Sequence, residues 1–395
     1  MGVTGNSELY KKYLEENGAA MKDSNGKDLK DNVKGSQCWC PITNLDTADA
    51  AYEWNIGQYY TTDTRADGTF TKLLSDDLTS EFVKYINAIE LKDPKGNKLS
   101  LTNTNEGSYY DYIKKILEES LNNFLSDTTF PWTRQSQQEF PRGLGRRLDD
   151  TTYNTVNDYI NYLNSDNNWV IYDSSTNKAT ITNIGDFVKK CKSASKNVNA
   201  FDDLNRNQGE NKVFGTNPEQ GEYTKHFDQI AYDLLNSNKG KYSEKSDWNS
   251  SYPDDYLNDF DDTNSIGHNV TYRLNMYNPM YYLSNYYDGY KTSDVADYFR
   301  INTGVFQSDT GNVVEINLYL ALINYGKNVK FTTVWEQKHV KAERTGDSDT
   351  NFINWINEIE ISEKDEKSET DTNSYFSNSI KNNYFILLLS MLLVL

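Results

Sequence analysis

Apolar side chains recur along this chain with two different periods, and the change from one to the other marks its organisation. Over 74–89, 109–121 and 153–163 they return every three or four positions, which is the spacing of one face of an α-helix. The same spacing predicts a shorter amphipathic helix at 7–20. By contrast, 33–42 is a short apolar run closed by a proline, and it predicts a buried strand.

The last quarter of the chain alternates between strand and helix. The pattern predicts a strand at 297–303, a helix at 312–325, a second strand at 328–335 and a helix at 349–359. Strands that alternate with helices form parallel βαβ units, so we expect an α/β fold with a partial parallel sheet. The strand at 33–42 is expected to join that sheet.

A long segment separates the first strand from this final α/β part. Residues 44–285 indicate an insertion of helices packed on one another, whose aromatic stripes belong to a core rather than to a ligand platform. The apolar runs on both sides of 173–178 predict a β-hairpin, and a short helix is expected around 187–191. Residues 200–268 are rich in Asn, Asp, Gly and Ser and are predicted to form long loops.

The end of the chain has two parts of opposite character. Residues 362–383 are polar and predict a disordered stalk, whereas 384–395 are almost all apolar. The apolar stretch is too short for an ordinary spanning helix but fits a GPI-attachment signal; a chance segment or a tail anchor is the alternative. The first residues carry no apolar leader, so we expect the natural protein to begin further upstream. These features predict an extracellular or cell-surface protein with a possible membrane attachment.

The composition agrees with a folded chain and excludes some partners. Mean hydropathy is −0.80, but 30 Tyr and 7 Trp supply apolar bulk that this index undercounts. A formal charge of −18 without a basic run argues against nucleic acid. Three cysteines make no disulfide framework, and Cys38 and Cys40 are expected to be small buried residues of a core strand. His226, His268 and His339 form no pair at ligand spacing, so no metal is expected.

One histidine lies where a general base lies in many α/β enzymes. His339 follows the strand that ends near Trp335 and precedes a helix, which places it at the carboxyl edge of a parallel sheet; an ordinary surface histidine is the alternative. An acid is expected in the loop after the preceding strand. Three positions after Gly304 stands Gln307, which can orient an imidazole but carries no charge, and Asp309 is the nearest carboxylate. Asp309 is expected to orient the imidazole, to cap the following helix, or to do both.

The order strand, acid, helix, strand, histidine is that of the second and third members of a Ser…Asp…His triad in an α/β-hydrolase. The first member stands on a G-x-S-x-G turn, and the 395 residues contain no such pentapeptide. The nearest fragments begin at Gly5 and Gly346 and lack the closing glycine. Ser36 and Ser308 are weak substitutes, because neither lies on a strand–turn–helix elbow with backbone amides behind it. The pattern therefore indicates a hydrolase whose nucleophile is missing from this chain.

Several long runs of the chain resemble a known family. The runs are TGNSELYKKYLEENGAA, KGSQCWCPITNLDTADAAYEW, FDDLNRNQGENKVFGT, YNPMYYL, RINTGVFQSDT and VWEQKHVKAERTGDSDTNFINWI. They resemble bacterial α/β-hydrolases of the subtype B tannase group and their feruloyl-esterase-like relatives, over about 1–60 and 165–360. The resemblance implies a hydrolase sheet with a large, mainly helical lid and hydrolysis of carboxylic esters, including those of phenolic acids. It implies no metal and no organic cofactor.

The resemblance also implies roles for individual residues. In the family the nucleophile elbow comes just before the segment matched by 4–7, and His339 matches the base. The family's acid falls on Gln307, and its second aspartate, which helps to hold phenolic hydroxyls in tannases, falls on Asp309. The amide at the acid position is a departure from the family pattern, and it bears on both the acid assignment and the specificity for tannins.

Together these observations predict the C-terminal part of an α/β-hydrolase fold in five segments. They are a partial core at 1–43, a lid at 44–285, a core segment with acid and histidine at 286–361, the stalk at 362–383 and the apolar tail at 384–395. We expect a relative of serine carboxylesterases that is inactive as this chain, with the missing N-terminal half on another chain as one arrangement. The alternative is a non-catalytic surface module that binds a small-molecule ester or a glycan.

Overall fold

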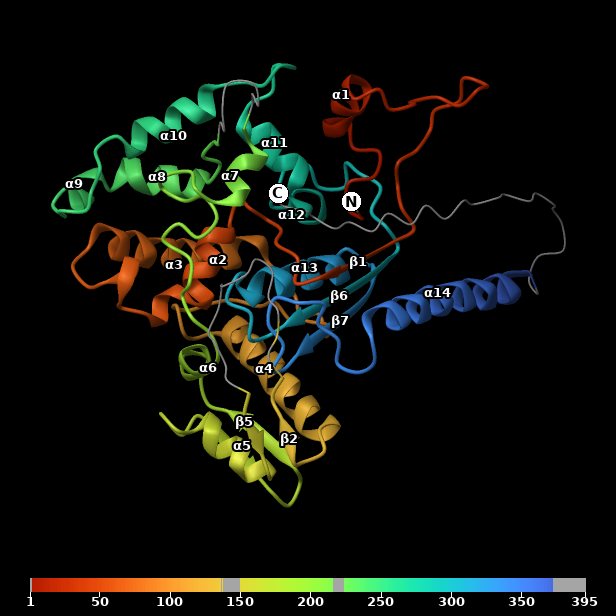
Figure 1. Cartoon of the computed structure of the whole chain (residues 1–395). Helices are drawn as coiled ribbons and strands as arrows, with labels where there is room; N and C mark the ends of the chain where they lie inside the picture. Colours follow the sequence, from red (N-terminus) through yellow and green to blue (C-terminus); the bar gives the residue numbers. More distant parts are fainter. Residues whose placement is uncertain (1, 136, 138–149, 216–223, 372–395) are drawn as a thin grey trace.

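A three-stranded parallel sheet lies at the centre of the molecule (Figure 1). The computed structural model describes residues 2–135, 137, 150–215 and 224–371. The sheet order is β1 (Gly35–Trp39), β6 (Tyr298–Gly304) and β7 (Asn328–Val334), and each pair of neighbours is parallel. Because the strands run in the same direction, the loops that follow them meet at one edge of the sheet.

Helix α13 (Asn312–Asn324) connects β6 to β7 and packs against both strands. The helix is apolar on almost every side because it is enclosed between the sheet and α2 (Ala48–Asn55). Three buried polar residues interrupt this pattern: Asn312, Glu315 and Asn317. The Tyr109 hydroxyl donates a hydrogen bond of 2.7 Å to Asn317 Oδ1, and Glu315 faces the loop that follows β6. Glu315 belongs to the candidate site described below.

The segment between β1 and β6 supplies most of the other elements. In chain order, the elements not yet given are α1 (Glu8–Glu16), the 3-10 turns η1 (Gly57–Tyr59) and η2 (Asp63–Arg65), α3 (Phe70–Ile89), α4 (Ser108–Asp127), β2 (Trp132–Thr133), β3 (Thr152–Tyr153), α5 (Val156–Leu163), β4 (Val170–Asp173), β5 (Lys178–Ile181), α6 (Ile184–Cys191), α7 (Gly209–Val213), α8 (Gln229–Ser237), α9 (Lys239–Tyr242), α10 (Tyr252–Asp261), α11 (Val270–Tyr277), α12 (Pro279–Leu283) and α14 (Ser348–Asp371). In the view of Figure 1, α8–α11 lie above the sheet, and α5 with the β4–β5 hairpin lies below it.

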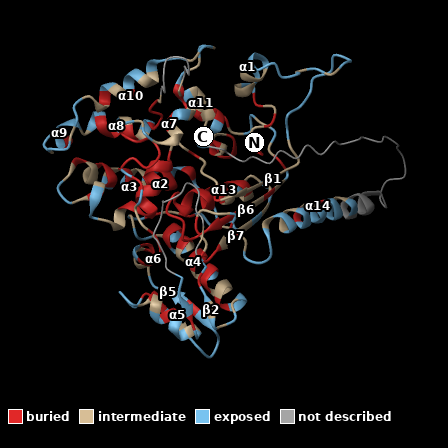
Figure 2. Cartoon of the chain, in the orientation of Figure 1, coloured by how far each residue is buried: buried red, intermediate tan, exposed pale blue. Residues whose placement is uncertain are grey.

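One continuous apolar cluster joins the sheet to the inserted helices, as the buried centre of Figure 2 shows. It contains Trp54 of α2, Phe82 of α3, Tyr109 of α4, Ile301 of β6 and Trp335 after β7. The Trp54 ring lies 5.2 Å from the Phe82 ring and 5.6 Å from the Tyr109 ring, at distances where aromatic pairs attract. Residues on both sides of the predicted boundary between core and lid therefore share one core, and the five-segment division stays a prediction.

The elements with strong periodicity lie almost where the sequence places them. The helices predicted over 74–89 and 109–121 are α3 and α4, and the hairpin around 173–178 is the antiparallel pair β4–β5. The start of α3 follows from its cap, because Thr69 Oγ1 accepts a hydrogen bond of 3.1 Å from the Lys72 amide. The predicted order of β6, α13 and β7 is also correct.

The long loops predicted over 200–268 are wrong in large part, because α7, α8, α9 and α10 lie in this segment. Helix α8 begins after Asp228, whose Oδ1 accepts hydrogen bonds from the amides of Ile230 at 2.8 Å and Ala231 at 3.1 Å. Helix α10 has Pro253 in its first turn, where its missing N–H costs no hydrogen bond. These short helices bury few side chains, so their polar composition concealed them.

Strand β1 differs from the buried strand predicted for 33–42. It is an edge strand of the described sheet, and all five of its residues are only partly buried. Cys38 is half-buried on this strand, whereas Cys40 follows it and is buried; these two cysteines and Cys191 are free thiols. The prediction of buried small residues thus holds for Cys40 and is wrong for Cys38, because within the described residues β1 has a neighbouring strand on one side only.

Helix α14 is longer than predicted and continues to Asp371, so 362–371 is helical rather than a disordered stalk. Glu and Lys are good helix formers, and Glu363 Oε1 lies 2.5 Å from Lys34 Nζ, which ties the helix to the segment before β1. Among the residues that the structure describes, no helix is both long enough and apolar enough to span a membrane. The rest of the predicted stalk and the apolar tail at 384–395 lie outside the described residues.

Candidate functional site

The carboxyl edge of the sheet brings together the three residues singled out in the sequence. Gln307 and Asp309 lie in the loop between β6 and α13, and His339 lies in the loop between β7 and α14. His339 Nδ1 is 2.8 Å from Gln307 Oε1 and 3.7 Å from Asp309 Oδ2. The amide is therefore the direct hydrogen-bond partner of the imidazole, and the carboxylate lies just beyond hydrogen-bond distance. The His339 side chain is only 20% exposed, so it is not an ordinary surface histidine.

Two buried side chains hold Gln307 from behind. Gln307 Nε2 is 2.8 Å from the Thr303 hydroxyl and 2.5 Å from Glu315 Oε1. Thr303 is the penultimate residue of β6, and Glu315 lies in the first turn of α13. The amide thus forms part of the rigid junction between strand and helix, and this junction fixes the position of its oxygen beside His339.

The loop that carries Gln307 and the loop that carries His339 cross in close contact. A Cβ atom on Gly304 would lie 2.1 Å from the Lys338 carbonyl oxygen, so only glycine fits there. The Phe306 amide donates a hydrogen bond of 2.9 Å to the Gln337 carbonyl. The Cys40 sulfur lies 3.6 Å from the Lys338 carbonyl and accepts a hydrogen bond of 3.4 Å from the Gly304 amide. Burial raises the pKa of the Cys40 thiol to about 12, so it stays protonated.

Asp309 also contacts a buried lysine that the sequence did not single out. Lys196 Nζ is 3.4 Å from Asp309 Oδ1 and 4.0 Å from the centre of the Phe201 ring. Burial raises the pKa of Glu210, and the charge of Lys196 lowers it. Burial lowers the pKa of His339, Asp309 raises it, and Lys196 lowers it. The imidazole is therefore neutral near pH 7, the form that can accept a proton.

A second lysine lies buried beneath the Gln307 loop. Lys192 Nζ donates hydrogen bonds of 2.6 Å to the Gln307 carbonyl and 2.5 Å to Asn312 Oδ1. Burial lowers the pKa of Lys192 to about 7, and burial raises the pKa of Glu315 to about 7. Each of these charges favours the ionised form of the other in an interior where a single charge would be costly. Lys192 therefore fixes the backbone of the loop, and it is enclosed rather than available to a ligand.

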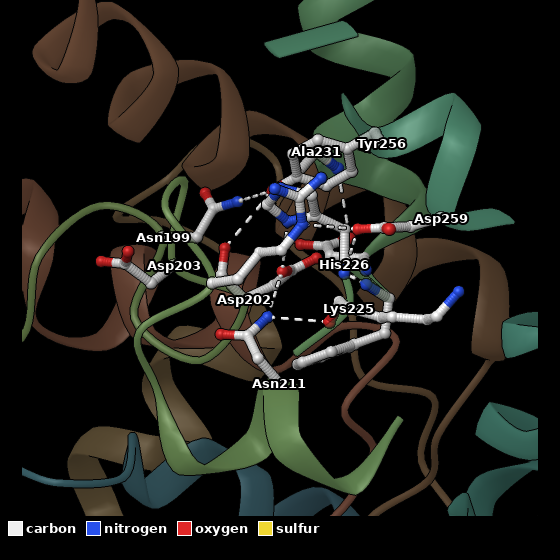
Figure 3. A network of polar contacts seen from close by, with 12 residues as sticks. Asn199, Asp202, Asp203, Asn211, Lys225, His226, Ala231, Tyr256 and Asp259 are labelled. Carbon is white, nitrogen blue, oxygen red and sulfur yellow. Dashed lines mark hydrogen bonds and ion pairs between the residues drawn. The ribbon is translucent and has the colours of Figure 1, made fainter. Parts of the chain in front are cut away.

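A separate network of buried polar groups lies between the loop at 199–203 and helices α8 and α10 (Figure 3). His226 Nδ1 is 2.7 Å from Asp202 Oδ1, and both side chains are fully buried. Asp202 also accepts hydrogen bonds of 2.7 Å from Asn211 Nδ2 and from the Asp228 amide. The His226 ring stacks on Tyr256 with the ring centres 3.6 Å apart. The pair has the form of an acid–base dyad, but its enclosure makes it part of the scaffold.

This buried network also fixes the loop that carries Lys196. Asp49 of α2 accepts hydrogen bonds of 2.6 Å from the Phe201 amide and 3.1 Å from the Asp202 amide. The Lys196 amide donates a hydrogen bond of 3.3 Å to the hydroxyl of Tyr52, which also lies on α2. Helix α2 therefore sets the distance between Lys196 and the sheet.

The serines considered as substitute nucleophiles are not oriented by His339. Ser308 is fully buried, and its Oγ accepts a hydrogen bond of 3.0 Å from the Ser193 amide. Ser36 lies on β1. Within the described ranges, no group of three or more His, Cys, Asp or Glu side chains could hold a metal ion.

Solved structures of tannases match the chain over most of its length. Fusobacterium nucleatum tannase matches with a TM-score of 0.59 and 24% identity, over 91% of this chain and 64% of that one. The native structure of tannin acyl hydrolase from Lactobacillus plantarum matches with a TM-score of 0.58 and 22% identity, over 90% of this chain and 61% of that one. This chain has the tannase fold.

The tannase fold confirms the resemblance inferred from the sequence at the level of architecture, including the partial α/β sheet. The chain spans less than two thirds of the length of these tannases, 61% and 64%. No family model and no curated protein sequence matches it. A separate lid and the roles of individual residues remain predictions within this tannase fold.

Sequence reasoning missed Lys196, Glu315 and Cys40 as parts of the site. Glu315 gave a usable signal, because a carboxylate inside an apolar helix needs a specific partner. Lys196 gave none, because it lies in a polar loop far from Asp309 in the sequence. Cys40 was assigned to the core, and its contacts with both loops depend on the sheet register.

Proposed function

We propose that this chain carries the general base, its orienting groups and the acyl-binding groups of a carboxylic ester hydrolase with the tannase fold. The observation that carries the proposal is the pairing of His339 Nδ1 with Gln307 Oε1 at 2.8 Å, at the carboxyl ends of parallel strands. With Nδ1 engaged there, His339 Nε2 is the nitrogen left to accept a proton from an attacking hydroxyl. Asp309, 3.7 Å from Nδ1, stabilises the imidazolium that would form.

The proposed substrate class is an ester of a phenolic acid. Two similar solved structures are tannin acyl hydrolases in complex with 3,4-dihydroxybenzoate and with ethyl gallate. In this chain Lys196 and Asp309 lie 3.4 Å apart beside His339 and offer a donor and an acceptor, which is what neighbouring phenolic hydroxyls require.

Binding of 3,4-dihydroxybenzoate, followed by calorimetry, tests this part of the proposal. We expect saturable binding that weakens roughly tenfold or more in the Asp309→Asn variant, because a hydrogen bond to a charged group is worth about 1.5–3 kcal/mol. Lys95→Met, at an exposed turn, is the matched control and should bind like the parent. Equal affinity for benzoate, which lacks the hydroxyls, would overturn the proposed substrate class.

We further propose that these 395 residues bind the ester without turning it over, because they contain no G-x-S-x-G sequence. Loss of the nucleophile costs about a million-fold in a triad hydrolase. A second chain that supplies the nucleophile is the partner this proposal implies. We expect neither release of nitrophenol from an aryl ester nor covalent labelling by a fluorophosphonate; labelling of any serine would contradict this.

A binding module without catalysis is the second candidate, and the amide at position 307 favours it. An amide cannot stabilise an imidazolium by charge, so an uncharged Gln307 beside His339 suits a protein that binds its ligand without catalysis. A phenolic ester or a glycan bound as tightly by His339→Ala as by the parent chain would favour the module. Weaker binding by His339→Ala would favour the hydrolase. Attachment to a cell surface remains a proposal that rests on the sequence alone.

A further inference from the structure

We propose that Glu315 is a positioning residue that sets the tautomer of His339 through the amide of Gln307. The inference deepens the proposed function, on which it rests, by naming the buried carboxylate that makes an uncharged side chain serve at the acid position. Glu315 does not touch His339, and its action passes through one side chain, whose orientation it decides.

The hydrogen bonds of Gln307 leave its amide one orientation. The amide nitrogen has two protons and no lone pair to offer, and its carbonyl oxygen can only accept. Nε2 lies 2.8 Å from Thr303 Oγ1 and 2.5 Å from Glu315 Oε1, so both of its protons are used on the buried side. Above the Glu315 pKa of about 7, where this side chain is a carboxylate, a flipped amide would place its oxygen against the carboxylate and be repelled.

The hydroxyl of Thr303 supports the same assignment. Its oxygen lies 2.8 Å from Gln307 Nε2 and 3.3 Å from Asn312 Nδ2, and both of these amide nitrogens are donors. The single hydroxyl proton is then free for Glu315 Oε1, which is 3.1 Å away. Glu315 Oε1 therefore accepts hydrogen bonds from both Thr303 and Gln307, and every donor in this set has an acceptor.

The orientation of the amide determines the protonation of the imidazole. Gln307 Oε1 faces His339 Nδ1 at 2.8 Å and can only accept, so Nδ1 must carry the proton. His339 Nε2 is then the unprotonated nitrogen, and this is the tautomer that a general base needs. A glutamine without a partner behind it could present either its oxygen or its nitrogen, and it would not select this tautomer.

Several observations distinguish this arrangement from an ordinary buried glutamate. Glu315 is the buried ionisable residue of a helix whose other buried positions are apolar except for Asn312 and Asn317, and its side chain is fully buried. Within the described residues its Oε2 has no hydrogen-bond partner, and a buried polar atom without a partner destabilises the fold. An apolar side chain would pack here without that cost, so packing alone does not explain a carboxylate at this position. The hydrogen bonds of Oε1 go to Gln307 and to the threonine that shares it.

Nitrogen-15 NMR of the imidazole rings tests the proposal on the whole chain, because the protein has only 3 histidines and His339→Asn assigns the relevant signal. In the parent chain we expect the neutral His339 ring to carry its proton on Nδ1. In Glu315→Met, which keeps the volume and removes the acceptor, the amide is free to turn and we expect the signal to shift to the Nε2–H tautomer. Glu315→Gln keeps an acceptor oxygen and should restore the parent spectrum.

The rings of His226 and His268 serve as internal controls, since neither contacts Glu315 and neither should change tautomer. An Nε2–H tautomer in the parent chain would overturn the proposal, and this result needs no folded variant. An unchanged Nδ1–H signal in Glu315→Met would also overturn it. The outcome is separate from that of the 3,4-dihydroxybenzoate titration, because the tautomer is observed without ligand and without turnover.

Discussion

Single atoms decide the geometry at the crossing of the two loops that form the candidate site. Gly304 allows the Lys338 carbonyl to approach, and the Cys40 sulfur lies between the same two segments. Beside this crossing, Lys196 and Asp309 contact each other at 3.4 Å, and in the proposed function this pair faces the acyl group of the substrate. Because few atoms form this crossing, we expect a substitution at any one of these residues to change the geometry of the site.

Gly304→Ala should destabilise the fold and displace His339. The added Cβ would lie 2.1 Å from the Lys338 carbonyl, and overpacking of this kind costs typically about 1–3 kcal/mol. Urea unfolding measures the loss, and the NMR signal of His339 reports the displacement. Gly240→Ala is the control, because a Cβ there meets nothing within 4 Å and should leave both readouts unchanged. A Gly304→Ala variant as stable as the parent would contradict the close crossing.

Lys196→Met should raise the pKa of His339. Burial lowers this pKa and the Lys196 charge lowers it further, whereas Asp309 raises it. Removing the ammonium also frees Asp309 to act on the imidazole alone. The titration midpoint of the His339 ring, followed by NMR, should therefore move to higher pH in this variant and stay constant in Lys95→Met. A midpoint that falls or stays in place would show that Lys196 does not act on the ring.

Secondary-structure elements act on the site through the buried network of Figure 3. Helix α2 presents Asp49 to the backbone at 201–202, and α8 begins with the cap residue Asp228 beside it. Burial raises the pKa of Asp49 to about 7, and burial also raises the pKa of Asp228, with the two carboxyl groups acting on each other. The loop that carries Lys196 is thus held by groups that retain protons in the folded state.

Asp228→Asn should stabilise the protein increasingly as the pH rises. The pKa of Asp228 is raised in the folded state, whereas the pKa in the unfolded chain is near 3.9. Between these two pKa values the folded chain holds a proton that the unfolded chain has lost. The stability of the parent protein therefore falls as the pH rises through this range. Asparagine does not titrate, still caps α8 and can donate to Asp49.

Urea unfolding across this pH range measures the effect of Asp228→Asn. We expect a gain in the free energy of unfolding near pH 8, and a smaller gain near pH 4. Asp233→Asn, at an exposed position of α8, is the control and should show no such dependence. A gain that is the same at both pH values would show that Asp228 is ionised in the folded chain.

The larger of the two apolar clusters in the described chain runs from Val3 to Trp335, and the smaller one consists of Cys40, Val334 and Ala342. The alternation of strand and helix over 297–335 was readable from the sequence because β6 and α13 are largely buried, and Val329 and Phe331 of β7 alternate with polar residues. The helices α7–α10 could not be predicted from apolar periodicity, because they contain few buried residues. A polar cap residue fixes the start of α8, where Asp228 accepts hydrogen bonds from the first turn. His339 and Gln307 were found because strand order fixes loop position, whereas Lys196 is placed only by tertiary contacts.

The chain should unfold in one cooperative thermal transition. The shared cluster joins α2, α3, α4 and the sheet, so no large part of the described chain has an apolar core of its own. Differential scanning calorimetry should show a single peak whose calorimetric and van 't Hoff enthalpies agree. Two separated transitions would instead favour an independent lid, and a broad transition without a heat-absorption peak would indicate a loosely packed chain.

The close crossing of the two loops at Gly304 fixes the His339 ring before any ligand binds. The orientation of the imidazole is settled when the chain folds, so the ester of the proposed function would encounter a base that is already preorganised and needs no induced fit at the proton-accepting atom. Adaptation to differently shaped acyl groups then falls to the flank that carries Lys196. Evolution could retune ligand choice on that flank while leaving the acid–base geometry untouched.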